Sequence, residues 1–237
     1  NSLNQEIIEF LPEVLETVDA NAAGLVIGNQ AGGMPGAFSA GANLMDVAAA
    51  VKENRFSDLE KMIAGLQYGL LNLRYAPFPV VAAPFGLALG GGCELCLASD
   101  RTVAHTELYM GLVEIGVGLL PAGGGCLNLW RKFLASVPAV VTDIDLAKFF
   151  IPVFMSIAMA KVSMSAAEAR AGVQTRPVLE RAFGDQIRVV EREGVVEGIT
   201  IRDGYAGDLD PSGGAVFCLG ASLTLRECLL MENEAAE

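Results

Sequence analysis

A glycine triplet followed by a carboxylate is the segment of this sequence best suited to chemistry. Gly90, Gly91 and Gly92 stand between an apolar strand-like run and a predicted helix, and Glu94 falls in the first turn of that helix. Glycines let a ligand approach the backbone closely, and the free N–H groups of a helix N-terminus attract negative charge. A partly buried glutamate beside that ligand could transfer protons near neutral pH. The same glycines could instead only let the helix pack closely against a sheet.

Three further segments favour the chemical interpretation. Residues 38–44 (FSAGANL) form a second loop of small residues, whose backbone N–H groups can point outward. Glu114 supplies a second carboxylate about twenty residues after Glu94, and residues 116–125 form another glycine-rich segment that leads into a helix. A loop N–H, a helix-end N–H and two carboxylates could together polarise a carbonyl group and carry out acid/base chemistry.

Composition narrows the class of protein. The 237 residues are 52% hydrophobic and carry a net charge of −12, which predicts a well-buried globular chain and argues against nonspecific binding to nucleic acid or to an anionic membrane. The most apolar stretch, residues 79–98, approaches membrane-spanning length but contains two prolines, four glycines and Glu94, so we expect no membrane span.

Cysteine usage indicates a reduced, cytoplasmic compartment. The chain has five cysteines, an odd number, and its first residues do not resemble a signal peptide. Cys93 and Cys96 form a CxxC pair, but His105 is the only histidine, so a metal site is not expected and buried helical cysteines are the simpler interpretation. Nothing near His105 forms a nucleophilic dyad, which favours a surface or loop role for it.

The elements that must position these residues follow a βαβ order. Apolar periodicity predicts a helix from the first residues, capped by Asn1 or Ser2, and the Gly/Pro pattern separates strands from helices thereafter. We predict a strand at 24–28, a loop at 29–42, a helix at 46–73, a strand at 79–83, a turn at 84–92, a helix at 93–99, a strand at 101–104, and helices at 126–134 and within 143–171. The last helical region is expected to break or kink near Pro152 and to restart with a cap at Ser165. This order predicts an α/β fold with a mostly parallel sheet covered by helices.

The motifs resemble one known family. The segments FSAGANL, PVVAAPFGLALGGGCELCLASD and LVEIGVGLLPAGGG, in this order, are similar to the crotonase superfamily and specifically to its enoyl-CoA hydratase/isomerase group. The resemblance covers residues 1–168 and implies a crotonase-like fold with a ββα-superhelix core. Its nearest form is the hydratase portion of bacterial 3-hydroxyacyl-CoA dehydrogenases, because of FSAGANLM and KVSMSAAEAR. No complete GxGxxG follows a strand, so a dehydrogenase module is not expected in this chain.

The resemblance implies a role for each matching residue. The backbone N–H groups of Ala42 and Gly91 would form the oxyanion hole for a thioester oxygen. Glu94 and Glu114 would hold and activate the water that adds to a trans-2-enoyl-CoA in fatty-acid β-oxidation. The coenzyme A would be part of the substrate, with no further cofactor, and the protein would be a homo-oligomer, a trimer or hexamer.

The resemblance implies only some of the contacts to coenzyme A. The carbonyl of Ala40 would meet the adenine amino group, and Leu44 would lie beside the coenzyme. Met45 stands where some relatives carry a lysine for the CoA phosphates. Lys52, Arg55 or a base from a neighbouring subunit could replace that lysine, although a solvated helix face is the simpler interpretation of Lys52 and Arg55.

Two alternative functions stay open at this point. An isomerase would need chiefly one glutamate, so the presence of two favours hydration. A noncatalytic acyl-CoA-binding or assembly module is the other alternative, because the β-hairpin that leads the family fold is not found before NSLN and the tail matches poorly. We therefore predict a core over residues 1–172 without its first strands and a C-terminal segment over 173–237. Met155, Met159 and Met164 could line an acyl pocket, and helix packing is the simpler interpretation for them.

Overall fold

The parallel sheet expected from the βαβ order is present. The computed structural model describes residues 2–29, 37–135 and 145–171, together with eight short strands between residues 187 and 235. Every strand pair of the main sheet is parallel, in the order β11-β1-β3-β5-β7. Its strands are β1 (Leu25–Ile27), β3 (Val80–Ala82), β5 (Arg101–His105), β7 (Ile187–Val190) and β11 (Phe217–Leu219).

A second, three-stranded parallel sheet was not foreseen. It has the order β2-β4-β6 and consists of β2 (Ala37–Ser39), β4 (Gly86–Leu89) and β6 (Leu108–Gly111). The loop predicted at 29–42 therefore ends in a strand, and the turn predicted at 84–92 contains another. These strands are three or four residues long and rich in Ala and Gly, which have weak β propensity, so pairing with parallel neighbours decides their structure.

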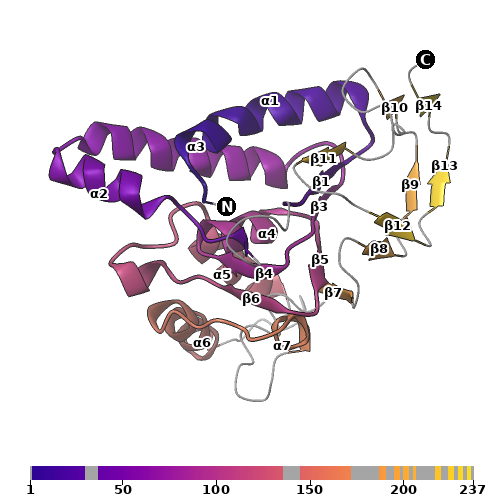
Figure 1. The fold of residues 1–237 in the computed structure, drawn as a ribbon. Helices are drawn as coiled ribbons and strands as arrows, with labels where there is room; N and C mark the ends of the chain where they lie inside the picture. The colour runs from indigo at the N-terminus through magenta and orange to yellow at the C-terminus, as the bar shows by residue number, and fades with distance from the viewer. Residues whose placement is uncertain are drawn as a thin grey trace.

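Two long helices lie side by side above the main sheet (Figure 1). They are α1 (Gln5–Asn21) and α3 (Phe56–Arg74), which contact each other. Gly65 and Gly69 of α3 permit this approach, because a methyl group at either would lie 2.9 Å from a side-chain atom of Ile8 or Leu11 in α1. The cap of α1 is Asn4, whose side chain accepts a hydrogen bond from the Ile7 N–H, and not the earlier residues predicted from sequence.

The single helix predicted at 46–73 is two helices. The first, α2 (Leu44–Lys52), ends where Asn54 adopts a left-handed φ of 55°. The N–H of Asn54 donates to the Val51 carbonyl and the N–H of Arg55 donates to the Ala50 carbonyl, which is the Schellman pattern of a helix C-terminus. Only the polar residues 52–55 stand at this turn, and no Pro or Gly marks it, so the sequence prediction joined α2 to α3.

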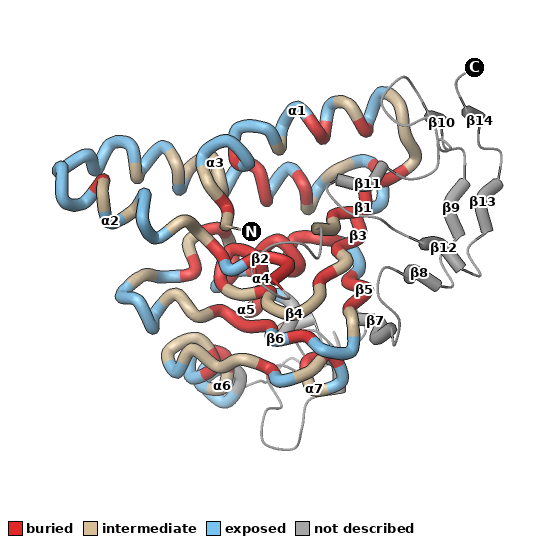
Figure 2. The backbone as a smooth tube through the Cα atoms, viewed as in Figure 1, coloured by how far each residue is buried: buried red, intermediate tan, exposed pale blue. Residues whose placement is uncertain are grey.

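The helix after the glycine triplet lies at the centre of the molecule. All eight residues of α4 (Gly91–Ala98) are buried (Figure 2), including Cys93 and Cys96, as the simpler interpretation of the CxxC pair predicted. Burial raises the pKa of the Cys93 thiol well above its usual value. The glycine triplet thus carries a ligand-facing backbone on a helix that the core holds on every side.

Three further helices cover the other side of the molecule (Figure 1). They are α5 (Gly125–Ala135), α6 (Leu146–Ala158) and α7 (Ala166–Ala171). Pro152 lies inside α6 and does not end it, so the helix is not broken there, and the chain turns after Met159, where Ala160 has a φ of 45°. The predicted cap of α7 is confirmed, because Ser165 Oγ accepts a hydrogen bond from the Glu168 N–H at 3.0 Å.

The remaining strands form parallel pairs within the C-terminal segment. There β10 pairs with β14, β12 with β8, and β13 with β9. Their bounds are β8 (Val195–Glu197), β9 (Thr200–Arg202), β10 (Tyr205–Ala206), β12 (Thr224–Arg226), β13 (Leu229–Met231) and β14 (Glu234–Ala235). Among the described residues, no helix is both long enough and apolar enough to cross a membrane.

Candidate active site

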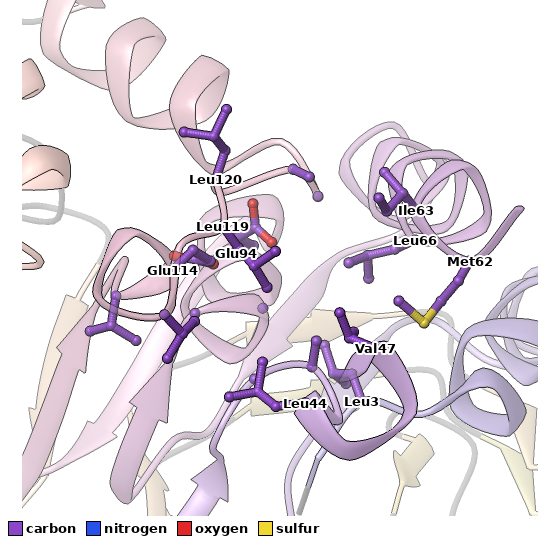
Figure 3. Close-up of a pocket in the computed structure, with 18 of the residues that line it drawn as sticks. Leu3, Leu44, Val47, Met62, Ile63, Leu66, Glu94, Glu114, Leu119 and Leu120 are labelled. Atoms are coloured by element: carbon purple, nitrogen blue, oxygen red, sulfur yellow. The ribbon is translucent and has the colours of Figure 1, made fainter. Parts of the chain in front are cut away.

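A pocket of about 460 Å³ opens between the α2–α3 pair and the segment that follows β6. Figure 3 shows Glu94 and Glu114 on one side of this pocket and apolar side chains of α2 and α3, among them Val47 and Leu66, on the other. Glu94 and Glu114 are the only ionisable side chains among its lining residues in the described part of the chain. The site therefore combines two carboxylates with an otherwise apolar surface.

The structure brings together all six site residues that the sequence singled out. Each of them lines this pocket, although they come from three separate segments. The loop between β2 and α2 contributes two and the first residue of α2 a third, the N-terminal turns of α4 contribute two, and the 3-10 helix η1 (Glu114–Val117) contributes one. These residues are Ala40, Ala42, Leu44, Gly91, Glu94 and Glu114.

The loop before α2 is fixed by backbone bonds to the start of the chain. The Leu3 N–H donates to the Gly41 carbonyl at 2.8 Å, and the Asn43 N–H donates to the Leu3 carbonyl at 3.1 Å. In such a parallel bridge the N–H of the intervening residue, Ala42, points away from Leu3. Gly41 has a φ of 90°, and its N–H donates to the buried Ser39 hydroxyl at 3.2 Å. The Ala42 N–H is thus held in a defined direction.

The N-terminus of α4 lies against this loop. Gly90 has a φ of 54°, which turns the chain from β4 into the helix. A methyl group at Gly91 would lie 2.8 Å from the Leu3 side chain and 3.8 Å from the Ala42 nitrogen, so the backbones of Gly91 and Ala42 approach each other closely. The first N–H groups of a helix have no carbonyl partner within it. The two backbones therefore place N–H donors from separate segments at one end of the pocket.

The Glu94 carboxylate is almost completely buried and is held by the glycines that precede α5. Its side chain is 2% exposed, and its Oε1 accepts a hydrogen bond from the Gly125 N–H at 2.7 Å. The pKa of Glu94 is raised to about 7: burial is the largest cause and the charge of Glu114 adds to it, while the N–H groups of Gly125 and Gly123 oppose the rise. A carboxyl group with this pKa can accept or donate a proton at neutral pH.

Glu114 is the less constrained of the two acids. Neither of its carboxylate oxygens has a hydrogen-bond partner within the described residues. Burial raises its pKa, and the nearby N–H groups of Glu114 and Val113 partly offset that rise. A methyl group at Gly90 would lie 3.2 Å from Oε1 of Glu114, so the glycine leaves room for this carboxylate. Buried acceptors without a partner are uncommon in folded proteins, and here they face a cavity that a ligand can fill.

Sequence reasoning missed the residues that complete the pocket. Leu59, Met62 and Leu66 of α3 form its apolar wall, a role for which only their helical spacing gave a signal. Nothing in the sequence indicated that Gly123 and Gly125 enclose the Glu94 carboxylate, since a methyl group at either would lie 2.6 or 2.8 Å from it.

The methionines proposed for an acyl pocket do not line this one. Met155, Met159 and Met164 are 40%, 62% and 60% exposed on and after α6. Trp130 of α5 is half-buried and packs edge to face on Phe150 of α6, with ring centroids 5.9 Å apart. His105 is half-buried as the last residue of β5, and not in a loop, and it accepts a hydrogen bond from the Glu107 N–H at 3.2 Å.

The bases considered for the CoA phosphates lie outside the pocket. Arg55 pairs with Glu53 at 2.7 Å and with Asp58 at 2.8 Å on the surface, as expected of a solvated helix end. Lys52 is exposed at the end of α2 and does not line the pocket. No cluster of His, Cys, Asp and Glu within the described residues could hold a metal ion.

Comparison with known proteins gives a consistent match over the first part of the chain. A family model described as enoyl-CoA hydratase/isomerase matches residues 1–137. A probable 3-hydroxyacyl-CoA dehydrogenase of Bacillus subtilis is 42% identical over 170 residues, which are 72% of this chain and 20% of that protein. Human mitochondrial methylglutaconyl-CoA hydratase is 34% identical over 133 residues, 55% of this chain and 37% of that protein.

Solved structures agree with this match. The crystal structure of an enoyl-CoA hydratase from Bacillus anthracis superposes with a TM-score of 0.59 at 27% identity, covering 80% of this chain and 61% of that one. An enoyl-CoA hydratase from Polaromonas gives a TM-score of 0.60 at 26% identity, covering 81% and 63%. The chain spans about a fifth of the length of the first curated relatives and under two thirds of these structures.

Proposed function

The chain belongs to the enoyl-CoA hydratase/isomerase family of the crotonase superfamily, and from that premise we propose that it adds water to the double bond of a trans-2-enoyl-CoA thioester. One observation carries the choice of hydration: two carboxylates, Glu94 and Glu114, face a single apolar pocket at the end where two backbone segments present N–H groups. Hydration needs one group to activate water and another to deliver a proton, whereas isomerisation needs chiefly one.

The backbone would stabilise charge on the thioester oxygen. The N–H groups of Ala42 and Gly91 would donate to this oxygen as the enolate develops. A pre-oriented donor of this kind contributes about 3 kcal/mol to the transition state. The bridge from Leu3 and the bond to Ser39 support this role, because they hold the loop before the substrate arrives.

The carboxylates would divide the proton transfers. Ionised Glu94 would take a proton from a water molecule as its oxygen bonds to Cβ, and protonated Glu114 would give a proton to Cα as the double-bond electrons move there. The product carries OH at Cβ and H at Cα, and a proton passed from Glu94 to Glu114 restores the starting state. The pKa of Glu94, raised to about 7, and the raised pKa of Glu114 support acid/base roles for both groups.

The coenzyme would lie toward the loop before α2. The Ala40 carbonyl would accept a hydrogen bond from the adenine amino group, and Leu44, which is 45% exposed, would contact the coenzyme at the pocket mouth. We further propose that the chain is the hydratase part of a longer bifunctional enzyme of fatty-acid β-oxidation, acting in the cytoplasm as a homo-oligomer. The match to one fifth of the Bacillus subtilis protein supports the first part of that proposal.

The test follows the conjugated enoyl absorbance of a trans-2-enoyl-CoA mixed with the purified chain. We expect turnover by the unmodified chain and at least a hundredfold loss in Glu94→Gln and in Glu114→Gln. Glu60→Gln, on the exposed face of α3, is the matched control and should keep full activity. Undiminished turnover in both site variants would refute the assigned roles. Calorimetry with an acyl-CoA that shows binding without turnover would favour a noncatalytic module, and conversion of a 3-enoyl to a 2-enoyl thioester without hydration would favour an isomerase.

A further inference from the structure

An exposed glutamine of α3 makes a hydrogen bond to the loop behind the buried glutamate. Nε2 of Gln67 donates to the Ala122 carbonyl at 2.7 Å, joining residues that are 55 positions apart in the chain. Gln67 does not line the pocket, and neither the family motifs nor the proposed proton transfers use it. The bond is short for an exposed side chain, and it can hold the loop that contains Ala122 in place.

The partner loop is the one that shapes the surroundings of Glu94. Ala122 is followed by Gly123, where a methyl group would lie 2.6 Å from Oε2 of Glu94. Two residues later, the Gly125 N–H donates to Oε1 of the same carboxylate at 2.7 Å. A shift of the Ala122 carbonyl would therefore be passed within three residues to the N–H groups that face Glu94.

Few other bonds hold this part of the loop. Before it, the Leu119 N–H donates to the Glu114 carbonyl, and after it the Asn128 N–H donates to the Gly124 carbonyl, so both of these bonds stay local. Apart from the N–H groups that face Glu94, the Gln67 bond is the only hydrogen bond that joins residues 120–123 to another element in the described part of the chain. The remaining contact with α3 is the apolar side chain of Leu66 against Gly123.

We propose that Gln67 is a positioning residue for the proposed hydration, in which its hydrogen bond to Ala122 holds the Gly123–Gly125 backbone against the Glu94 carboxylate. The expected effect on kcat rests on the proposed function, whereas the hydrogen bond between Gln67 and Ala122 and its effect on the Glu94 carboxylate do not. Gln67 acts through the loop and touches neither substrate nor water.

The charged surroundings of Glu94 define the expected effect of losing this bond. Glu114 faces it from η1, Cys126 faces it from α5, and Cys93 is its neighbour on α4, all of them acidic or neutral groups. No Lys, Arg or His lines the pocket among the residues that the structure places. The N–H groups of Gly123 and Gly125 are then the main stabilisation of the ionised form, and loosening them raises the pKa of Glu94 further.

The experiment compares Gln67→Ala and Gln67→Met with Asn72→Ala in the full chain. Met keeps the length of the side chain and removes the donor, and Asn72 is an exposed amide on the same helix but away from the pocket. The acid limb of the kcat profile against pH should move upward by about half a unit in both Gln67 variants, with kcat at neutral pH reduced roughly threefold, as expected for one net hydrogen bond. Asn72→Ala should have the same kcat profile as the unmodified chain. The unfolding temperature of each variant should be measured as well, because it shows whether a change in kcat comes from lost stability.

A second measurement does not depend on turnover. The carboxyl carbon of Glu94, assigned by its loss in Glu94→Gln, is titrated by NMR in ¹³C-glutamate-labelled protein. An upward shift in both Gln67 variants and not in Asn72→Ala supports the positioning role, even if the unmodified chain fails to hydrate an enoyl thioester and the proposed function is wrong. Titration curves of the Gln67 variants that coincide with that of the unmodified chain would overturn the inference, whatever the activity.

Discussion

Gly123 offers the sharpest test of how closely the Glu94 carboxylate is held. In Gly123→Ala the new methyl group would lie 2.6 Å from Oε2 of Glu94, whereas ordinary contacts begin at 3.4 Å, so the two groups must separate by 3.4 − 2.6 = 0.8 Å. The methyl group would also lie 3.0 Å from a terminal methyl of Leu66, which can rotate away. The carboxylate has less freedom, because its other oxygen is bonded to the Gly125 N–H at 2.7 Å.

The expected effects on activity and on stability differ in size. A misplacement of about 1 Å in a reacting group costs on the order of a hundredfold in rate, so we expect kcat to fall by about that factor. Overpacking in a well-filled interior lowers the free energy of unfolding by about 1 to 3 kcal/mol. The φ of Gly123 is not in the left-handed region, so no backbone strain is added to this steric effect.

The assay measures kcat and KM on a trans-2-enoyl-CoA together with unfolding in urea. Gly116→Ala is the matched control, because a methyl group at Gly116 in η1 would meet only the Cβ of Ala160, at 4.0 Å. We expect that variant to keep its activity and to change stability by no more than about 0.5 kcal/mol. If Gly123→Ala turned over as fast as the unmodified chain while Glu94→Gln were inactive, the close enclosure of the carboxylate would not matter for catalysis and the reasoning would be refuted.

Two further predictions concern stability and the loop before α2. Burial raises the pKa of Glu94 from 4.5 to about 7, so the folded protein keeps a proton that the unfolded chain has lost, and stability should fall by about 3 kcal/mol as the pH rises from about 4.5 to about 7. Urea unfolding at pH 5 and pH 8 should show this loss in the unmodified chain and little of it in Glu94→Gln, and an equal loss in both would assign it to other groups. In Ser39→Ala the buried Gly41 N–H loses its acceptor. We expect the free energy of unfolding to fall by about 1 to 3 kcal/mol and KM to rise. If neither value changed, the role given to the Ser39 hydroxyl would be contradicted.

The sequence was most informative where chemistry depends on local order along the chain. Gly91 and Glu94 share one helical turn, and Ala40, Ala42 and Leu44 lie in the loop before α2 and at the first residue of that helix, so a short motif was enough to predict that each set would act together. The parallel sheet covered by helices was predictable for a similar reason, because βαβ order leaves few topologies. These predictions used separations of a few residues.

Contacts between distant segments were beyond such reasoning. The Gly125 N–H reaches Glu94 across 31 positions, and Gln67 reaches Ala122 across 55, and no periodicity or motif indicates either pairing. The division of 46–73 into α2 and α3 depends on the left-handed backbone of Asn54, at a break that no Pro or Gly marks in the sequence. Strands β2, β4 and β6 were missed because each is only three or four residues long, although Phe38, Leu108 and Met110 bury their side chains in the core.

The net charge of −12 includes Glu94 and Glu114, and no base accompanies these two acids among the described residues that line the pocket. A base beside Glu94 would lower its pKa and hold it ionised, which would oppose the proton transfers that the proposed reaction needs. N–H dipoles stabilise the Glu94 anion less than a full charge does, so they leave its pKa near 7. The buried charge of ionised Glu94 destabilises the fold at neutral pH, and the packing of the wholly buried helix α4, with its tight glycine contacts, offsets that cost. On this argument the glycines around Glu94 and Glu114 set the acidity of the site as well as its shape.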